Sequence, residues 1–299
     1  MVSASRSPAV DPATDAPGRR RSWRVALLAP GLLWTLIFFV VPLVVMVVYS
    51  FGQIDIITFQ TTFGWTLDNY RRLANDIYLH TILRSLEMSI GATIGCLLVG
   101  YPVAYTIARQ KGRTQTLLLL GVMVPFWTSF VVRTYAWVNL LSNDGLVTRA
   151  LRGLGLESDS SQLIYTPTAV TIGIVYTYLP LMVLPLYVAL ERIDPQLLQA
   201  ASDLGAGWFG RFRRVVLPLS MPGVIAGCIL VGVPATGEYV IPAILGGDKT
   251  LMYGNVVANQ FLKVGDYPFG SALAVSLMLL VTGFLLITRG RLARAEEIT

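Results

Sequence analysis

The stretch "LLQAASDLGAGWFGRFRRVVLPLS", Leu197–Ser220, is polar, glycine-spaced and basic in a chain that is otherwise apolar. It stops at a Leu-Pro pair that opens another apolar run. Of the 299 residues, 54% are hydrophobic and 13% are charged, whereas a soluble domain usually carries about 25% charged residues. This composition predicts an all-α, polytopic membrane protein in which the quoted stretch connects two membrane spans.

Six uncharged runs have, or nearly have, the length of about 20 residues that a helix needs to cross the hydrocarbon core. They are Val25–Phe51, Met88–Ala108, Thr114–Val132, Ser160–Leu190, Val215–Gly237 and Tyr267–Thr288. Prolines recur inside these runs, so we expect kinked spans. The chain then divides into a disordered cytoplasmic tail over residues 1–22, a six-helix membrane domain over residues 23–290 and a cytoplasmic C-terminal tail over residues 291–299.

Arginine and lysine gather in alternate connections. They lie in the N-terminal tail, in residues 109–113, in residues 191–214 and in the C-terminal tail. Because cytoplasmic loops carry the excess of these residues, we expect both termini and both connections on the cytoplasmic side. The formal charge of +6 is therefore a sign of membrane topology, and no nucleic-acid partner is expected.

Few residues offer catalytic or metal chemistry. Cys96 and Cys228 lie inside apolar runs, and His80 has no second His or Cys near it. We therefore expect neither a disulfide nor a metal site. One histidine leaves no plausible Ser-His-Asp set, and no G-x-x-x-x-G-K-[ST] phosphate loop is present. No catalytic residue is expected, and any energy source must be another chain.

The quoted connection predicts two short helices joined by a glycine hinge. Asp194 and Pro195 suit a helix start, because the carboxylate caps the first turn and proline fits the first helical position. The residues that recur at i, i+4 and i+7 on one face are Leu197, Ala201 and Leu204. Gly205 allows a left-handed turn, and Trp208–Arg214 predicts a second helix at the membrane surface. From the residues alone, this connection is equally an interfacial linker or a rigid projection that docks on a partner.

The same connection resembles the EAA loop of ABC-importer permeases, E-A-A-x-x-x-G, nine residues, then I-x-L-P. Here Gln199 replaces the usual Glu, Val215 replaces Ile, and the spacing is kept. The resemblance implies that residues 191–214 hold a coupling helix that docks into a cleft on an ATPase subunit. The coupling residues that it implies are Gln199, Ala200, Ala201, Asp203, Gly205, Leu217 and Pro218.

Three further stretches are similar to spermidine/putrescine permeases: Gly100–Arg109, Val124–Trp137 and Gly237–Gly247. The resemblance implies a type I ABC-importer permease of a bacterial inner membrane that moves polyamines by alternating access. Its partners would be membrane lipid, a second homologous permease, two ATPase subunits and a periplasmic or lipid-anchored substrate-binding protein. This chain would hold no cofactor, since the ATPase would bind ATP and Mg²⁺. A permease for another small solute remains open, because related permeases share these stretches.

Charged and aromatic residues near the span ends are candidates for the substrate path. Acidic residues prevail on the predicted outer side, which favours a cationic substrate. Ionised groups at membrane depth are costly unless they are paired or hydrated, so Glu238 and Arg133 either serve the path or pair, with each other or with the partner permease. The aromatic candidates offer cation–π faces but are also typical interface anchors. The full set is Glu238, Tyr239, Arg133, Trp127, Tyr135, Trp137 and Glu87.

A self-sufficient secondary transporter is the rival from another functional class. It would use intramembrane carboxylates for a coupling ion and commonly shows an inverted repeat. We find no clear repeat between the two halves, and an EAA-like loop has no purpose in such a protein. A membrane enzyme is third, since no catalytic cluster stands out in the sequence.

Overall fold

The computed structural model describes residues 28–55, 61–155, 162–247 and 250–296. The predicted N-terminal tail, residues 1–22, lies outside them. Five helices in the described ranges are long and apolar enough to cross a membrane, and a bent pair makes a sixth if it is counted as one span. The strands β1 (Gln53–Ile54) and β2 (Thr61–Thr62) pair antiparallel in a small hairpin. The all-α membrane architecture is confirmed.

The chain comprises two units, residues 1–48 and residues 49–299. The first unit contains most of the candidate span Leu28–Tyr49. Within this span, the π-helix η1 (Leu36–Val40) leads into α2 (Val41–Tyr49), which holds Pro42. Since Pro42 has no N–H to donate, the wider turn directly before it accommodates the proline while the helix continues.

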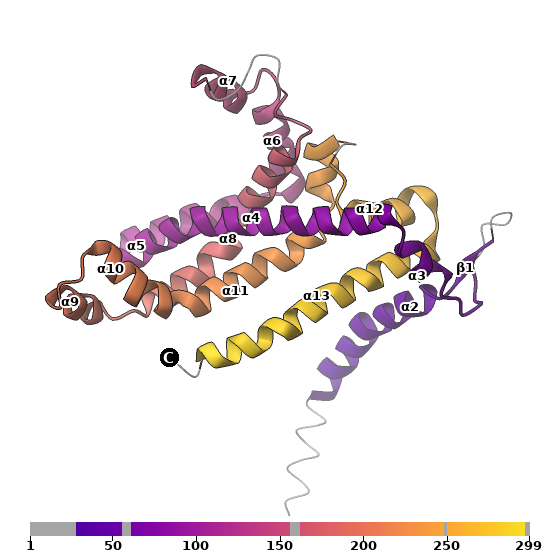
Figure 1. Ribbon diagram of the computed structural model, residues 1–299, viewed down its shortest axis with the longest axis horizontal. Coiled ribbons are helices and arrows are strands. Elements are labelled where there is room, and N and C mark those ends of the chain that lie inside the picture. The colour runs from indigo at the N-terminus through magenta and orange to yellow at the C-terminus, as the bar shows by residue number, and fades with distance from the viewer. Residues whose placement is uncertain (1–27, 56–60, 156–161, 248–249, 297–299) are drawn as a thin grey trace, which may run out of the picture. The chain divides into compact units, whose positions relative to one another are not determined.

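Three long helices form the centre of the second unit and pack side by side (Figure 1): α4 (Asp76–Arg109), α8 (Pro167–Glu191) and α11 (Leu217–Thr236). Small residues on α11 bring it close to α8. A Cβ atom at Gly223 would lie 2.6 Å from the Cβ of Ala189, and one at Gly227 would lie 2.6 Å from the Sδ of Met182. Close backbone approach of this kind is the usual packing of helices in lipid, where van der Waals contact drives association.

The second span is longer than the sequence predicts. Helix α4 begins at Asp76, capped by the side chain of Asn75, which accepts a hydrogen bond from the N–H of Ile77 at 3.4 Å. The prediction Met88–Ala108 missed the first turns because their polar residues give no hydropathy signal. Glu87 therefore lies well inside α4 and not near its outer end.

The third run, Thr114–Val132, is not one straight helix but part of a broken candidate span. Helix α5 (Arg113–Met123) and the 3-10 helix η2 (Val124–Trp127) are followed, after a bend of 94°, by α6 (Phe130–Leu141) and then α7 (Leu146–Gly153). Thr128 is extended, with ψ 156°, and its hydroxyl donates to the carbonyl of Pro125 at 2.7 Å. This hydroxyl satisfies a helix-terminal carbonyl, so the chain can turn there.

The predicted surface helix Trp208–Arg214 is not a separate element. Helix α10 (Trp208–Arg211), the π-helix η3 (Phe212–Val216) and α11 form one continuous candidate span, Trp208–Thr236. The π turn stands directly before Pro218, as η1 does before Pro42. The fourth predicted span also changes, since α8 starts only at Pro167, where the Thr166 hydroxyl accepts from the Ala169 N–H at 3.2 Å.

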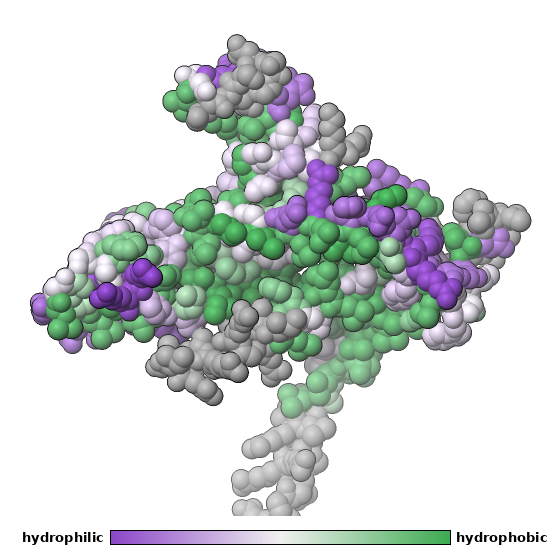
Figure 2. Space-filling view, in the orientation of Figure 1, coloured by the Kyte–Doolittle hydropathy of each residue, from purple (hydrophilic) through white to green (hydrophobic). Residues whose placement is uncertain are grey.

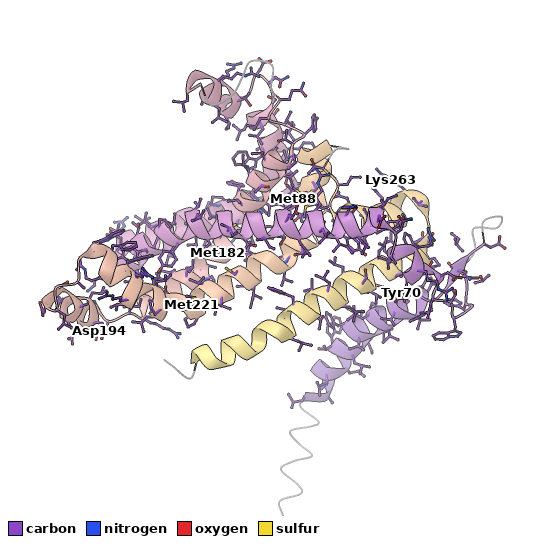
Figure 3. All side chains as sticks on the ribbon, in the orientation of Figure 1. Tyr70, Met88, Met182, Asp194, Met221 and Lys263 are labelled. Atoms are coloured by element: carbon purple, nitrogen blue, oxygen red, sulfur yellow. The ribbon has the colours of Figure 1, made fainter. Side chains whose placement is uncertain are left out.

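The last span, α13 (Tyr267–Glu296), continues into the predicted C-terminal tail. Short elements stand before it: η4 (Pro242–Gly246), α12 (Tyr253–Asn259) and η6 (Gln260–Val264). Figure 3 shows Asp194, before α9 (Pro195–Asp203), at one end of the second unit, and Tyr70 and Lys263 at the other. Figure 2 shows a largely hydrophobic face between these ends, with hydrophilic residues gathered near each. This is the surface that a bilayer-spanning bundle needs.

Candidate functional site

The connection at residues 191–214 folds as a helix, a glycine turn and a second helix. Asp194 accepts a hydrogen bond from the Gln196 N–H at 2.8 Å and caps α9 (Pro195–Asp203). Gly205 has φ +80°, in the left-handed region. The Gly205 N–H donates to the Ser202 carbonyl at 2.9 Å, and the Ala206 N–H donates to the Ala201 carbonyl at 3.0 Å. These two bonds form a Schellman motif. The predicted helix start and glycine turn are confirmed.

The predicted apolar face of α9, with Leu197, Ala201 and Leu204, is largely left free by its own chain. Leu198 is the anchor, since it is 8% exposed and packs in the cluster of Ile107 and Leu190. Leu197 and Leu204 are 49% and 89% exposed. The apolar side chains that stand out around the glycine turn, called the exposed tip below, are Leu197, Leu204, Trp208 and Phe209. Periodicity alone does not tell a helix face that packs internally from one left free.

Most of the predicted coupling residues are likewise exposed. Gln199, Ala200, Asp203, Gly205 and Pro218 are exposed, while Ala201 and Leu217 are half-buried. The Gly205 turn and a side-chain contact together hold the segment. The guanidinium of Arg211 donates to the Ser202 hydroxyl at 2.9 Å and so ties α10 to α9. The segment therefore presents exposed small, polar and apolar groups on a fixed frame, and the coupling role of these residues stays a prediction.

Glu238 is engaged by its own chain. Its side chain is buried, 7% exposed, between α11 and η4. The carboxylate Oε1 accepts from the N–H groups of Tyr239 at 3.0 Å, Val240 at 2.9 Å and Ile241 at 3.4 Å. The hydroxyl of Tyr178 on α8 donates to Oε2 at 2.6 Å. Burial is thus compensated by four donors. This arrangement supports a structural cap, and a role in the substrate path stays a prediction.

Arg133 is 9% exposed on α6 and does not pair with Glu238. Its guanidinium carbon lies 5.4 Å from the centroid of the Phe126 ring, which gives a cation–π contact. Its Nε finds no hydrogen-bond partner among the residues described. In the same ranges no ion pair joins it to a carboxylate. Pairing of Arg133 with a carboxylate of the partner permease therefore remains open as the alternative.

The aromatic candidates separate into two groups. Trp127, Tyr135 and Tyr239 are 74%, 56% and 46% exposed. Trp137 instead packs edge-on against Tyr176, with ring centroids 5.4 Å apart. Trp137 also packs against the core cluster that includes Ile241 and Leu245, which follow Glu238 in the chain. The structure thus brings the surroundings of Trp137 and Glu238 together, whereas Glu87 is exposed on α4.

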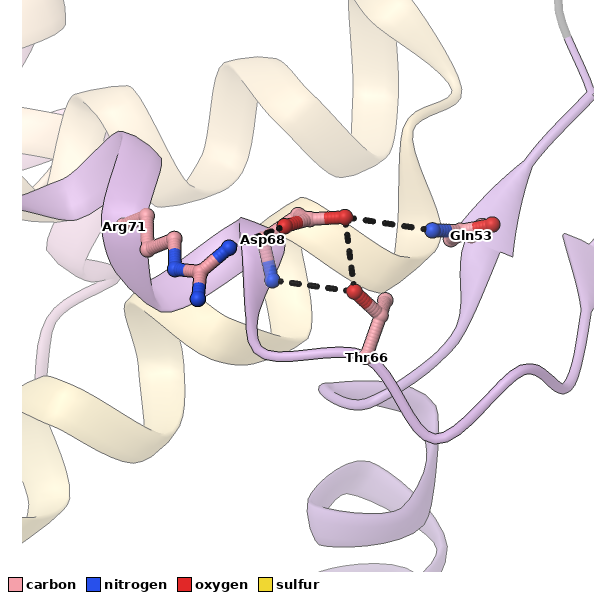
Figure 4. Close-up of polar contacts among 4 residues, drawn as sticks. All are labelled: Gln53, Thr66, Asp68 and Arg71. Carbon is pink, nitrogen blue, oxygen red and sulfur yellow. Dashed lines mark hydrogen bonds and ion pairs between the residues drawn. The ribbon is translucent and has the colours of Figure 1, made fainter.

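Asp68 and Asp266, two of the acidic residues on the predicted outer side, form ion pairs. Figure 4 shows Asp68, at the start of α3 (Asp68–Leu73), accepting from Thr66 at 2.7 Å and Gln53 at 3.3 Å and pairing with Arg71 at 3.3 Å. Asp266 is 6% exposed and pairs with Arg72 at 3.1 Å. These partners lower the free negative charge of the predicted anionic mouth. Glu157, Asp159 and Asp248 lie outside the described residues.

Comparison with known proteins places the chain in a family. It matches the binding-protein-dependent transport system inner membrane component over residues 21–292. It is 41% identical over 261 residues to the spermidine/putrescine transport system permease protein PotB of Escherichia coli, covering 87% of this chain and 94% of that protein. It is 34% identical over 271 residues to the inner membrane ABC transporter permease protein YdcU of the same organism, covering 87% and 86%.

Solved structures agree on the fold. A chain of a bacterial ABC transporter involved in import of the acidic polysaccharide alginate superposes with a TM-score of 0.69 at 19% identity, covering 93% of this chain and 98% of that one. A chain of the MetNI methionine ABC transporter gives a TM-score of 0.55 at 16% identity, covering 73% and 95%. The matched sequence, the bundle of candidate spans and these superpositions have one reading: the chain belongs to the binding-protein-dependent transport system inner membrane components and is a multi-pass permease of an ABC importer, not an enzyme.

Proposed function

We propose that this chain is the polyamine-conducting permease of an ATP-driven importer whose substrates are spermidine and putrescine. The observation that carries the substrate class is the 41% identity to the E. coli spermidine/putrescine permease, which extends over 94% of that protein. Similarity over nearly a whole permease includes the path as well as the coupling segment. A permease for another small solute of the same family is the alternative.

The proposed partners are a second homologous permease, two ATPase subunits that bind ATP and Mg²⁺, and a substrate-binding protein, periplasmic or lipid-anchored. The exposed tip supports the ATPase contact. Leu204 and Trp208 are 89% and 69% exposed at the end of a segment fixed by the Gly205 turn. Large apolar side chains held rigidly in water are typical of protein–protein contacts. Closure of the ATP-bound ATPases would move this segment and turn the spans outward.

The proposed orientation places both termini and residues 109–113 and 191–214 in the cytoplasm. The positive-inside pattern of the sequence supports it. Contacts between the two connections support their common side, because Arg109 and Arg211 line the same pocket, and the Gln115 side chain donates to the Glu191 carboxylate at 2.8 Å. Labelling of single cysteines in the 191–214 connection from outside intact cells would contradict this orientation.

Reconstitution of the complete complex in liposomes tests the function. We expect ATP-dependent uptake of labelled spermidine or putrescine that needs the binding protein, and no flux from this chain by itself. Flux without ATPase would instead indicate the secondary transporter. ATP-dependent uptake that ignores polyamines, together with a binding protein that captures another solute in a ligand screen, would keep the permease assignment and overturn the substrate.

A further inference from the structure

A pocket of about 370 Å³ lies where α4 ends and α9 and α10 meet. Its polar and aromatic lining comes from Tyr105, Arg109, Gln199, Trp208 and Arg211. This volume is within the range of roughly 300–1,000 Å³ that holds small ligands. The described residues that line it include no Asp or Glu. The pocket therefore gathers two positive charges from separate elements and supplies no negative charge of its own.

Both arginines are bonded only to neutral groups within the described residues. Arg109 donates to the hydroxyl of Tyr105 at 3.1 Å and lies 4.9 Å from the centroid of that ring. Arg211 donates to the Ser202 hydroxyl at 2.9 Å. A guanidinium has five N–H donors in a planar fork, so each side chain keeps donors for an anion. Gln199 sits in the pocket as a neutral amide, where a glutamate would be an internal counter-ion.

The position of the pocket favours a lipid headgroup as the anion that it would bind. Arg109 is the last residue of one candidate span, Asp76–Arg109, and Trp208 is the first of another, Trp208–Thr236. The pocket thus lies where two candidate spans end on the same side, which would put it within reach of lipid headgroups. Anionic headgroups attract basic residues at this depth.

We propose that this pocket binds the phosphate of an anionic phospholipid, held between the guanidinium groups of Arg109 and Arg211. A lipid seated there contacts α4, α9 and α10 at once. It would make the frame behind the exposed tip depend on the acidic lipid content of the membrane. The site is independent of the transported substrate, so a wrong polyamine assignment would not affect it.

Native mass spectrometry of the assembled complex tests the site, with phosphatidylglycerol and phosphatidylcholine offered at equal mole fraction. The wild-type complex is expected to retain phosphatidylglycerol preferentially. Arg109→Gln and Arg211→Gln should each weaken that retention about tenfold, the effect of losing one charge-assisted contact. Gln199→Glu should weaken it as well, because its carboxylate would pair with the arginines inside the pocket.

Arg213→Gln and Arg214→Gln are the matched controls, since both arginines are exposed neighbours that do not line the pocket. Each removes the same charge and should change retention less than about twofold. Equal loss in controls and pocket variants would overturn the proposal. So would a wild-type complex with no preference for phosphatidylglycerol, which decides the question even if a variant fails to assemble.

Two further arms separate the sources of negative charge. Added inorganic phosphate should leave the retained phosphatidylglycerol in place, and full displacement would assign the pocket to a soluble anion and overturn the lipid. The assembled complex is compared with the permease pair freed of ATPase. If only the freed pair retains the lipid, an ATPase side chain fills the pocket in the working complex, and the proposal fails.

Discussion

The α9 turn and the Glu238 site use the same device, a carboxylate that caps backbone N–H groups, with opposite results. At α9, Asp194 caps the helix start and leaves the exposed tip free, with Leu204 89% exposed. At the end of α11, the cap is Glu238 itself, buried under three backbone N–H groups and the Tyr178 hydroxyl. A group that is consumed in holding the fold is poorly placed to bind a passing ligand. The comparison separates a surface that its own chain leaves exposed from a carboxylate whose hydrogen bonds are all made within its own chain.

The largest expected effect is at the turn of the α9 segment. Ala201→Asp and Gly205→Asp should each lower polyamine uptake by more than about a hundredfold, since an unpaired charge buried in a docking contact costs several kcal/mol. Membrane abundance should stay normal, and co-purification with the ATPase should fall. Gly153→Asp is a matched control, because Gly153 on α7 is also exposed with open space around it. If these variants keep both ATPase association and uptake, the segment only connects two spans and does not dock on the ATPase.

Glu238 variants test the other side of the comparison. Glu238→Leu leaves buried N–H donors without a partner and should strongly reduce the amount of folded permease, measured by size-exclusion chromatography in detergent. Glu238→Gln keeps an acceptor and should lose stability by about 1.5–3 kcal/mol, the cost of a charge-assisted bond. Uptake per folded complex of the Gln variant is expected near wild type. A fall of tenfold or more in that ratio would place the charge in the substrate path.

Gly205 and Gly207, on either side of Ala206, differ in backbone conformation, and their alanine variants test how much that conformation matters. Gly205 has φ +80°, while Gly207 has φ −63°, and both have open space where a Cβ would point. Gly205→Ala should therefore cost about 1–2 kcal/mol, because an L-residue is strained in the left-handed region. Gly207→Ala should cost almost nothing. Hydrogen exchange of the Ala206 amide reports the difference, and equal protection in both variants would contradict it.

The smallest effect is expected from the two arginines of α3. Arg72 pairs with the buried Asp266 and lies over the Phe269 ring at 3.9 Å, whereas Arg71 pairs with the exposed Asp68. Arg72→Gln should lower stability by about 1–2 kcal/mol, a value that allows for the half-exposed arginine. Arg71→Gln should cost less than about 0.5 kcal/mol. Thermal unfolding midpoints in detergent compare the two, and equal shifts would show that burial of Asp266 adds nothing.

The sequence predicts the parts of the fold that depend on local chemistry. Apolar runs locate the spans because lipid demands them, and Asp194 and Gly205 mark helix ends because their roles are local. Proline does not decide by itself where a span breaks. Helix α8 continues through Pro180 and Pro185, yet the chain turns by 94° just after Pro125. The prolines and the hydropathy of these stretches are alike, so the sequence does not distinguish the two outcomes.

The candidate site shows the same limit. Residue types and spacing indicate the coupling segment, and they do not indicate which side of α9 stays free. The bond from Tyr178 to Glu238 joins residues 60 positions apart. The bond from the Tyr253 N–H to the Ser85 hydroxyl joins residues 168 apart. Such pairs carry no periodic signal, so the satisfaction of the buried carboxylate could be seen only in the folded chain.

The joining of α10, η3 and α11 has a mechanical consequence. The span Trp208–Thr236 has 29 residues, and at about 1.5 Å per residue it is a rod about 43 Å long. With Trp208 at one end and Glu238 just beyond the other, a tilt of about 5° would displace the far end by about 4 Å. The π turn at Phe212–Val216 lies near the Trp208 end, so most of the span lies beyond it. If the exposed tip docks on an ATPase as proposed, a displacement of the tip would be carried along this one span to the neighbourhood of Glu238.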